Sequence, residues 1–280
     1  MDVYHRIGFN PRRSPGLKEI IESLGISYNV APLPGYEVGL IYFDIYESDP
    51  AWPELHKILE AWPVSVSDRY DTIFTEEEIL AAAWVRLVPI HESGYLKPET
   101  PKWRFLIYEK YCEGCGAYEH QKGLIRMAKE PSRPKGSFVT PIGPYVLFCS
   151  PDIEQEIREA GIQGYEVWPV LEHRTGKPFA HTVQIYVREV TNPGLTRAEG
   201  LHPTRCEVCG RTKYRPHMRG VMYLRREAFE GKEGVDILHS YEWFGSGHAA
   251  YREIIISNCF ARLILEKGWK GVRLKVIEVV

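Results

Sequence analysis

The first 75 residues alternate between apolar segments with the period of a strand and segments with the period of a helix. Alternation of apolar and polar positions predicts strands over residues 3–9, 26–31, 36–46 and 64–74. Apolar residues three and four apart predict two helices, carried by Leu17, Ile20, Ile21 and Leu24, and by Leu55, Ile58, Leu59 and Trp62. The resulting order β-α-β-β-α-β is that of a ferredoxin-like unit, a fold that hosts many functions.

A further short helix is predicted over residues 76–84, where Thr75 supplies the N-cap and three glutamates occupy the first turn. Proline and glycine then recur between residues 89 and 101, which is typical of a linker. We therefore expect a domain boundary near residue 98. It separates a ferredoxin-like domain (1–98) from a second domain (99–280), and the fold class is α+β.

The second domain carries an internal repeat. A constant offset of 107 residues superimposes Ser150 on Ser257, Gly161 on Gly268 and Gly164 on Gly271. In each copy, a serine N-cap precedes about ten helical residues, and a C-terminal glycine precedes a buried strand. The pattern predicts two repeats of the β-α-β type, covering about 103–190 and 200–280.

Two identical C-x-x-C-G motifs precede the repeated helices. Cys112 and Cys115 belong to the first motif (112–116), and Cys206 and Cys209 belong to the second motif (206–210). Two cysteines three positions apart can direct both sulfurs at one cation, and four thiolates complete a tetrahedral structural zinc site. We therefore expect one structural Zn²⁺ per chain, held jointly by the two repeats.

Other uses of these cysteines stay open at this point. His120 and His217 follow the two motifs, so each motif with its histidine could form a separate site with an open position. A pair of C-x-x-C motifs could also cycle between thiols and a disulfide, which calls for a thioredoxin-like helix after the motif. The remaining cysteines, Cys149 and Cys259, adjoin apolar segments and are expected to be buried thiols.

Composition narrows the class of protein. The chain has 280 residues, 44% of them hydrophobic and 26% charged, which is typical of a folded globular protein. Its 35 Lys and Arg against 37 Asp and Glu give a charge of −2, which argues against a non-specific nucleic-acid binder. A local basic cluster surrounds the second motif: Arg205, Arg211, Lys213, Arg215 and Arg219. No apolar run reaches membrane-spanning length and no signal peptide opens the sequence, so we expect a cytoplasmic location.

The sequence contains no recognisable catalytic motif. Phosphate-binding, dinucleotide-binding, metalloprotease and serine-hydrolase motifs are all missing. Aromatic residues gather instead in a glycine-rich segment of the second repeat, and large aromatic side chains favour interfaces. The candidate partner-binding residues are Tyr241, Trp243, Phe244, His248 and Tyr251. Packing of this cluster in the core is the alternative.

Residues 103–280 resemble the double-CXXCG motif family of bacteria, some members of which are immunity proteins that neutralise a delivered toxin. The resemblance rests on the two motifs, on the closing strands after Gly164 and Gly271, and on the segment 224–229 (Leu-Arg-Arg-Glu-Ala-Phe). It implies a zinc site at the four cysteines. The first 98 residues lie outside it.

These observations favour a non-enzymatic, zinc-stabilised protein-binding module, of the immunity or antitoxin type, with a toxin-like protein as its partner. A nucleic-acid-associated zinc protein is the second hypothesis, based on the basic cluster. A metalloenzyme of unknown reaction is the third, and it requires an open metal position.

Overall fold

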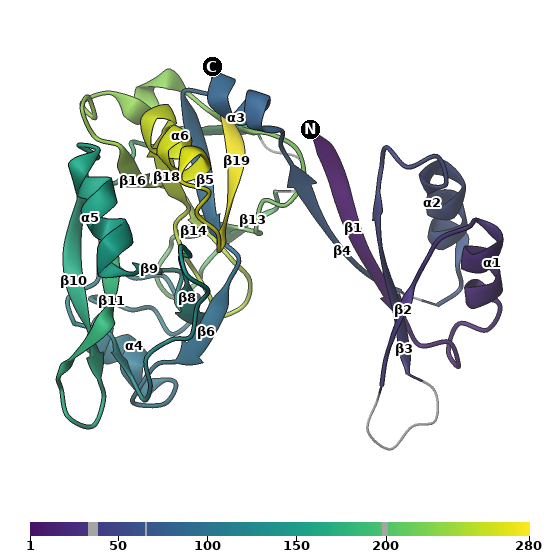
Figure 1. Cartoon of the computed structure of the whole chain (residues 1–280), viewed down its shortest axis with the longest axis horizontal. Coiled ribbons are helices and arrows are strands. Elements are labelled where there is room, and N and C mark those ends of the chain that lie inside the picture. The colour runs from purple at the N-terminus through teal and green to yellow at the C-terminus, as the bar shows by residue number, and fades with distance from the viewer. Residues whose placement is uncertain (33–38, 65, 198–200) are drawn as a thin grey trace. The chain divides into compact units, whose positions relative to one another are not determined.

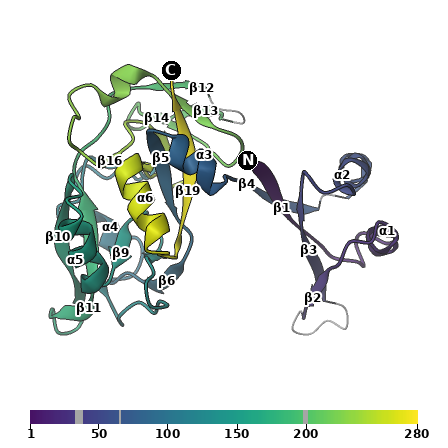
Figure 2. The ribbon, with the colours of Figure 1, turned by 45° about the horizontal axis from the view of Figure 1, so that its top comes forward.

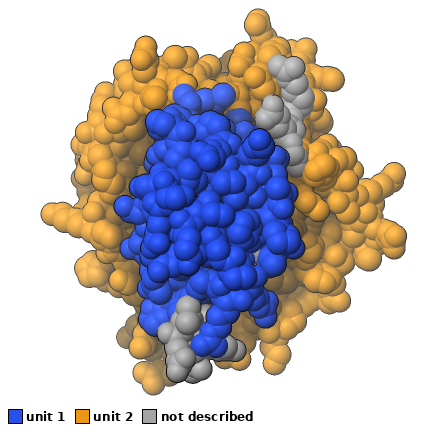
Figure 3. Space-filling model, turned by 90° about the vertical axis from the view of Figure 1, so that its right-hand side faces the viewer, with its two compact units in different colours: residues 1–74, 218–220 blue, residues 75–217, 221–280 orange. Residues whose placement is uncertain are grey.

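A computed structural model describes residues 1–32, 39–64, 66–197 and 201–280. The chain divides into two compact units, coloured in Figure 3: unit 1 contains residues 1–74 and 218–220, and unit 2 contains residues 75–217 and 221–280. Residues 36–38 of the strand predicted over 36–46, and residue 65 of the strand predicted over 64–74, lie outside the described residues. Within the described ranges, no helix has the length and apolar character needed to cross a bilayer.

Unit 1 is a four-stranded antiparallel sheet with two helices on one face (Figure 1). Its elements are β1 (Asp2–Phe9), α1 (Leu17–Ser23), β2 (Asn29–Ala31), β3 (Leu40–Tyr46), α2 (Trp52–Ala61) and β4 (Ser67–Ile73). The strand order is β2-β3-β1-β4. Leu17, Ile21 and Leu55 are fully buried against the strands, which is the helical face expected from the sequence.

A short segment from the second half of the chain completes unit 1. The backbone N–H of Thr72 in β4 donates to the carbonyl of Met218 (2.9 Å), and the N–H of Gly220 donates to the Thr72 hydroxyl (2.7 Å). Arg219 forms two hydrogen bonds with the Glu47 carboxylate, at 2.7 and 3.0 Å. Sequence patterns gave no indication of this long-range contact.

Unit 2 contains most of the secondary structure. Its helices are α3 (Glu76–Ala81), α4 (Lys102–Ile107), α5 (Pro151–Glu159), the 3-10 helix η1 (Arg226–Phe229) and α6 (Asn258–Glu266). Its first strands are β5 (Trp84–Pro89), β6 (Glu92–Tyr95), β7 (Arg126–Met127), β8 (Thr140–Ile142), β9 (Leu147–Cys149), β10 (Tyr165–Glu172) and β11 (Pro178–Val187). Its remaining strands are β12 (Leu195–Arg197), β13 (Pro203–Arg205), β14 (Thr212–Tyr214), β15 (Met222–Leu224), β16 (Ile237–His239), β17 (Trp243–Phe244), β18 (Ile254–Ser257) and β19 (Val272–Val279).

Two sheets dominate unit 2, and their strand orders correspond. One sheet runs β7-β10-β11-β9, and the other runs β12-β15-β19-β5-β18-β16. Both contain a parallel pair (β7 with β10, β15 with β19) followed by two antiparallel pairs, and the larger sheet has one further antiparallel strand at each end, β12 and β16. Helix α5 covers the first sheet and α6 covers the second (Figures 1 and 2). Smaller sheets, β13-β14-β17 and β6-β8, complete the unit.

The helix caps read from the sequence are confirmed. The Ser150 hydroxyl accepts the N–H of Ile153, and the Ser257 hydroxyl accepts the N–H of Phe260, both at 3.3 Å. Thr75 and Glu78 form a reciprocal capping box at the start of α3. This helix ends at Ala81, earlier than the predicted 84, because Trp84 already opens β5.

The glycines that follow α5 and α6 allow close approach between the two halves of unit 2, the half that contains α5 (about 103–190) and the half that contains α6 (about 200–280). The backbone of Gln163 pairs with Asp236 (N–H to O, 2.9 Å), and Lys270 pairs with residues 136 and 138 (2.9 Å each). A Cβ on Gly271 would collide with the carbonyl of Phe138, and one on Gly164 would lie 2.7 Å from the carbonyl of Ile237. Each half therefore contributes a loop that only glycine allows to contact the other half.

The division between the units falls after Phe74, earlier than the boundary expected near residue 98. Residues 84–89 form β5, which pairs with β18 on one side and β19 on the other. Val85 and Leu87 are fully buried there. The segment before the proline-rich stretch thus belongs to the core of unit 2, because its hydrogen-bond partners lie more than 160 residues later in the chain.

Candidate metal centre

The first C-x-x-C-G motif forms a tight turn that directs two sulfurs to the same side. The N–H of Gly116 donates to the carbonyl of Cys112, and the N–H of Cys112 donates to the carbonyl of Ala117, both at 2.7 Å. Gly116 has φ +80°, and a Cβ there would collide with the carbonyl oxygen of His248. The glycine is therefore required twice, by the backbone conformation and by the neighbouring loop.

The second motif repeats the same turn. The N–H of Gly210 donates to the carbonyl of Cys206 (2.8 Å), the N–H of Cys206 donates to the carbonyl of Arg211 (2.9 Å), and Gly210 has φ +72°. Nothing lies closer than 3.9 Å to a Cβ placed on Gly210. The local sequence thus dictates the same backbone in both motifs, although their surroundings differ.

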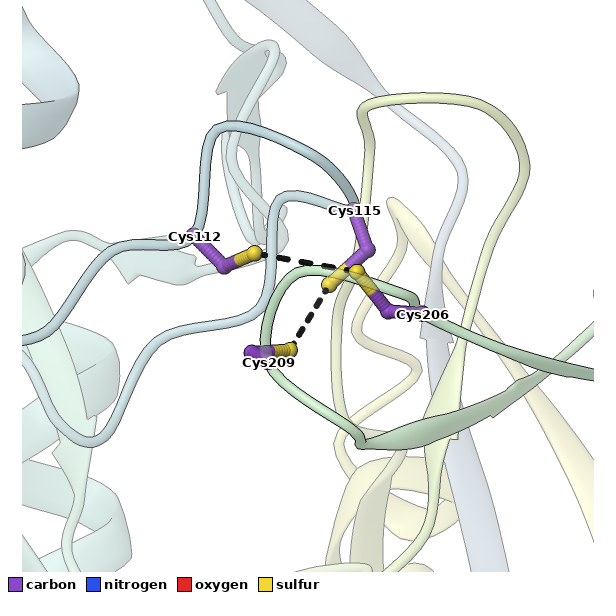
Figure 4. A group of neighbouring side chains, drawn as sticks. All are labelled: Cys112, Cys115, Cys206 and Cys209. Carbon is purple, nitrogen blue, oxygen red and sulfur yellow. Dashed lines mark hydrogen bonds between the residues drawn. The ribbon is translucent and has the colours of Figure 1, made fainter.

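The four sulfurs meet in one group. Figure 4 shows the two loops facing each other with their sulfurs turned inward: Cys112 Sγ lies 3.8 Å from Cys206 Sγ, and Cys115 Sγ lies 3.6 Å from Cys209 Sγ. All four sulfurs lie within 4.8 Å of one another. A tetrahedron with metal–sulfur bonds of about 2.3 Å has sulfur–sulfur edges of about 3.8 Å. The cysteines therefore fit a four-coordinate metal ion of the size of zinc.

The cysteines of the two motifs differ in burial and in the hydrogen bonds that their sulfurs accept. Cys112 and Cys115 are buried, Cys206 is half-buried and Cys209 is exposed. Burial raises the pKa of Cys115 to about 12. By contrast, backbone N–H groups of Cys209 and Val208 lower the pKa of Cys206 to about 7. Those N–H donors stabilise a thiolate, which is the form that binds a metal.

A buried lysine fastens the segment 247–249 to the cysteine group. Lys213 on β14 is 7% exposed, and its Nζ donates to the carbonyls of Cys115 (3.0 Å), Gly247 (2.6 Å) and Ala249 (3.0 Å). Three carbonyl acceptors saturate the ammonium group. Because Cys115 is one of the four cysteines, the positive charge of Lys213 also stabilises the thiolate form of the cysteine group. Lys213 therefore belongs to the interior and does not form part of an exposed basic surface.

The aromatic cluster proposed for partner binding is divided by the structure. Trp243 is 5% exposed and packs on Cys112, Cys115 and Ala117, while Phe244 is fully buried. Tyr251 is half-buried and pairs through its backbone with Phe244, whereas Tyr241 and His248 are exposed. Trp243 and Phe244 therefore lie in the core and not on an exposed loop. They do so because β17, which contains both residues, pairs with β14.

The two histidines considered as metal ligands lie outside the sulfur group. His120 Nε2 is 3.1 Å from Glu109, and with Glu119 they form an exposed group on the surface. His217 is buried and neither ring nitrogen has a hydrogen-bond partner in the described part of the chain. Of the other two cysteines, Cys149 is buried as expected. Cys259 is exposed, because it lies on the solvent side of α6.

Sequence analysis missed a buried ion pair near the centre of the six-stranded sheet. Arg86 on β5 is 1% exposed and lies 2.9 Å from the Glu253 carboxylate, which also accepts the Tyr145 hydroxyl at 3.2 Å. The guanidinium group donates as well to the carbonyl of His217 (3.2 Å). A charged residue between the apolar Val85 and Leu87 was the available signal, since such a position demands a buried partner.

No family model matches this chain, and no curated protein matches it either. The cysteine group therefore stands on its own geometry: four sulfurs, contributed in pairs by two identical turns, at the spacing of one tetrahedral metal ion.

Proposed function

We propose that the protein is a non-enzymatic module, stabilised by one zinc ion, that binds another protein and inhibits it as immunity proteins inhibit toxins. One observation carries this proposal: four sulfurs surround a single position. A metal ion with four protein ligands has no open position for a substrate or an activated water. The metal then serves to join the two halves of unit 2, and binding is left to the surface.

We also propose that unit 1 is ferredoxin-like and that unit 2 arose by duplication. The strand order β2-β3-β1-β4, with helices after β1 and β3, supports the first assignment. The corresponding sheet orders of unit 2 and the two identical turns support the second. In the second half, β5 would occupy the place that β11 occupies in the first half.

The alternative functions lose support from particular residues. A nucleic-acid surface around the second motif would need exposed cations, and two of the five basic residues there are not free for it: Lys213 is enclosed by three carbonyls and Arg219 pairs with Glu47. A metalloenzyme would need an open coordination position, which four thiolates do not leave. Binding of a protein partner requires neither an open coordination position on the metal nor exposed basic residues around the second motif.

Metal analysis of the purified chain tests the zinc assignment. We expect about one zinc per chain, and replacement by Co²⁺ should give the visible absorption of a tetrahedral thiolate site. Cys209→Ser should abolish both signals, while Cys259→Ser, also exposed but outside the motifs, should retain them. Two metal ions per chain, or metal retained in Cys209→Ser, would overturn the single four-cysteine site.

Affinity capture from the native host tests the binding role. We expect the full-length chain to retain one protein in a near-stoichiometric amount, and co-expression of the chain should suppress the toxicity of that protein. Retention of nucleic acid that dissociates as salt is raised would favour the second hypothesis instead. If no protein is retained, the proposal is refuted.

A further inference from the structure

A pocket beside the second C-x-x-C-G motif gathers three arginines. The pocket has a volume of 710 Å³, and its lining includes Arg211, Arg225 and Arg252. They come from three separate segments: Arg211 follows the motif, Arg225 follows β15, and Arg252 precedes β18. Trp243 and Tyr241 form an aromatic part of the same lining.

Ion pairs do not balance the charges of these arginines within the described ranges. In the described part of the chain, no carboxylate forms an ion pair with any of the three. The Nε of Arg252 is a buried atom without a hydrogen-bond partner, and the Arg252 guanidinium lies 4.7 Å above the Trp243 ring. Burial, together with the charge of Arg211, lowers the pKa of Arg252, while Tyr118, Tyr241 and Glu242 act in the opposite direction. A partly buried cation without a counter-ion is unfavourable until an anion joins it.

The two carboxylates in the lining are committed elsewhere. Glu119 pairs with Lys110 (2.7 Å), and one oxygen of Glu242 accepts the N–H groups of Gly194 and Leu195 at 2.9 and 3.0 Å. The second oxygen of Glu242 is buried and has no donor. The Glu242 oxygen and the Arg252 Nε are both enclosed by protein atoms, so neither is open to a ligand in the pocket.

We propose that this pocket binds an acidic segment of a protein partner, with a carboxylate among the three arginines and an apolar side chain beside Tyr241. A polypeptide offers carboxylates, N–H donors and apolar side chains that fit Tyr241 and Trp243. A phosphate group offers acceptors alone and has no apolar part to pack on the exposed Tyr241 ring. Arginine matches a carboxylate with paired N–H donors, and arginine with aromatic residues is typical of interface centres. This inference rests on the proposed protein-binding function and names the chemistry of the partner.

Peptide binding to the full-length, metal-loaded chain tests the inference. The probe is a fluorescein-labelled, N-acetylated nonapeptide of alternating Asp and Tyr, and its twin carries Lys in place of Asp. Fluorescence anisotropy should show binding of the acidic peptide that weakens with salt, and no binding of the Lys twin. Arg225→Glu, at an exposed position, should weaken binding at least tenfold. Arg215→Glu, an exposed arginine outside the pocket lining, is the matched control and should bind as the unmodified chain does.

Metal content and melting temperature of each variant show whether it has kept its fold. Equal binding by Arg225→Glu and the unmodified chain would overturn the inference, as would equal binding of the two peptides. Displacement of the peptide by inorganic phosphate at similar concentration would overturn it too, in favour of a phosphate site. If Arg225→Glu still captures the host partner at full strength, the pocket inference fails while the proposed function stands. If peptide binding follows the prediction but no host protein is retained, the proposed function fails instead.

Discussion

Loss of the metal should destabilise unit 2 by an amount that follows from the chain length between the two motifs. Cys112 and Cys206 are 94 residues apart, and a shared metal ion closes this segment into a loop. On a chain-entropy basis, a cross-link over about 94 residues restricts the unfolded state by about 4.7 kcal/mol at 25 °C. We therefore expect Cys209→Ser, which opens the site at an exposed sulfur, to lower the unfolding free energy by about 4–5 kcal/mol.

Urea unfolding followed by tryptophan fluorescence measures this change. Of the seven tryptophans, Trp52 and Trp62 belong to unit 1, and the others belong to unit 2, so the signal reports mainly on unit 2. A chelator should shift the midpoint of the unmodified chain towards that of Cys209→Ser and leave the variant unchanged. The stabilisation by the metal should also be lost in acid, because the cysteine thiols must be deprotonated to bind metal.

Cys259→Ser is the control for introducing serine at an exposed cysteine, and it should unfold as the unmodified chain does. If the metal-loaded chain and Cys209→Ser share one midpoint, and chelator moves neither, the reasoning is refuted. In that case the two halves would be held together by their packing alone.

Three further perturbations follow from single contacts. Gly116→Ala should destabilise the protein by several kcal/mol, because a Cβ collides with the His248 carbonyl; Gly210→Ala, with only a positive φ, should cost about 1–2 kcal/mol, and equal melting temperatures would contradict this. Glu253→Gln should cost about 3–5 kcal/mol in urea unfolding because it leaves Arg86 buried without its counter-charge. Combining it with Arg86→Met should restore part of that loss, and an additive loss would be the contrary result. Burial and the charge of Arg86 lower the pKa of His217 to about 3, against about 6.5 in the unfolded chain. Its contribution is complete above about pH 6.5 and is lost as the pH falls towards 3, with a slope of up to about 1.4 kcal/mol per pH unit. His217→Asn should flatten the pH dependence of unfolding in that window, and an unchanged profile would refute the assignment.

The metal site could be anticipated from the sequence because its geometry is local. Four consecutive backbone positions and one glycine determine each turn, so the motif by itself directs both sulfurs to one side. The serine caps of α5 and α6 were equally accessible, since a cap involves residues only three apart. Pairing of the two motifs was an inference from the number of sulfurs that a zinc ion requires, and the gathered sulfurs agree with it.

The division into units could not be obtained in this way. Residues 84–89 precede the proline-rich stretch and were therefore assigned to the first domain, yet in the fold they lie between β18 and β19. The prolines and glycines that follow them suggested a linker, but such residues indicate only local turns. They do not specify which distant strands a segment pairs with. The sequence left open whether Trp243 is exposed or in the core for the same reason, because a distant parallel pairing with β14 puts it against the cysteines.

The sequence by itself therefore determined the elements of unit 1, the helix caps and the turn of each cysteine motif, all of which depend on neighbours within a few residues. The tertiary structure decided which charges are internal and which remain available. Lys213 and Arg86 found acceptors from distant segments and became part of the core, while Arg211, Arg225 and Arg252 were brought to one pocket without a carboxylate partner in the described part of the chain. The physical reason is that the energy of a charge depends on the groups that surround it in the folded chain, and long-range contacts choose those groups.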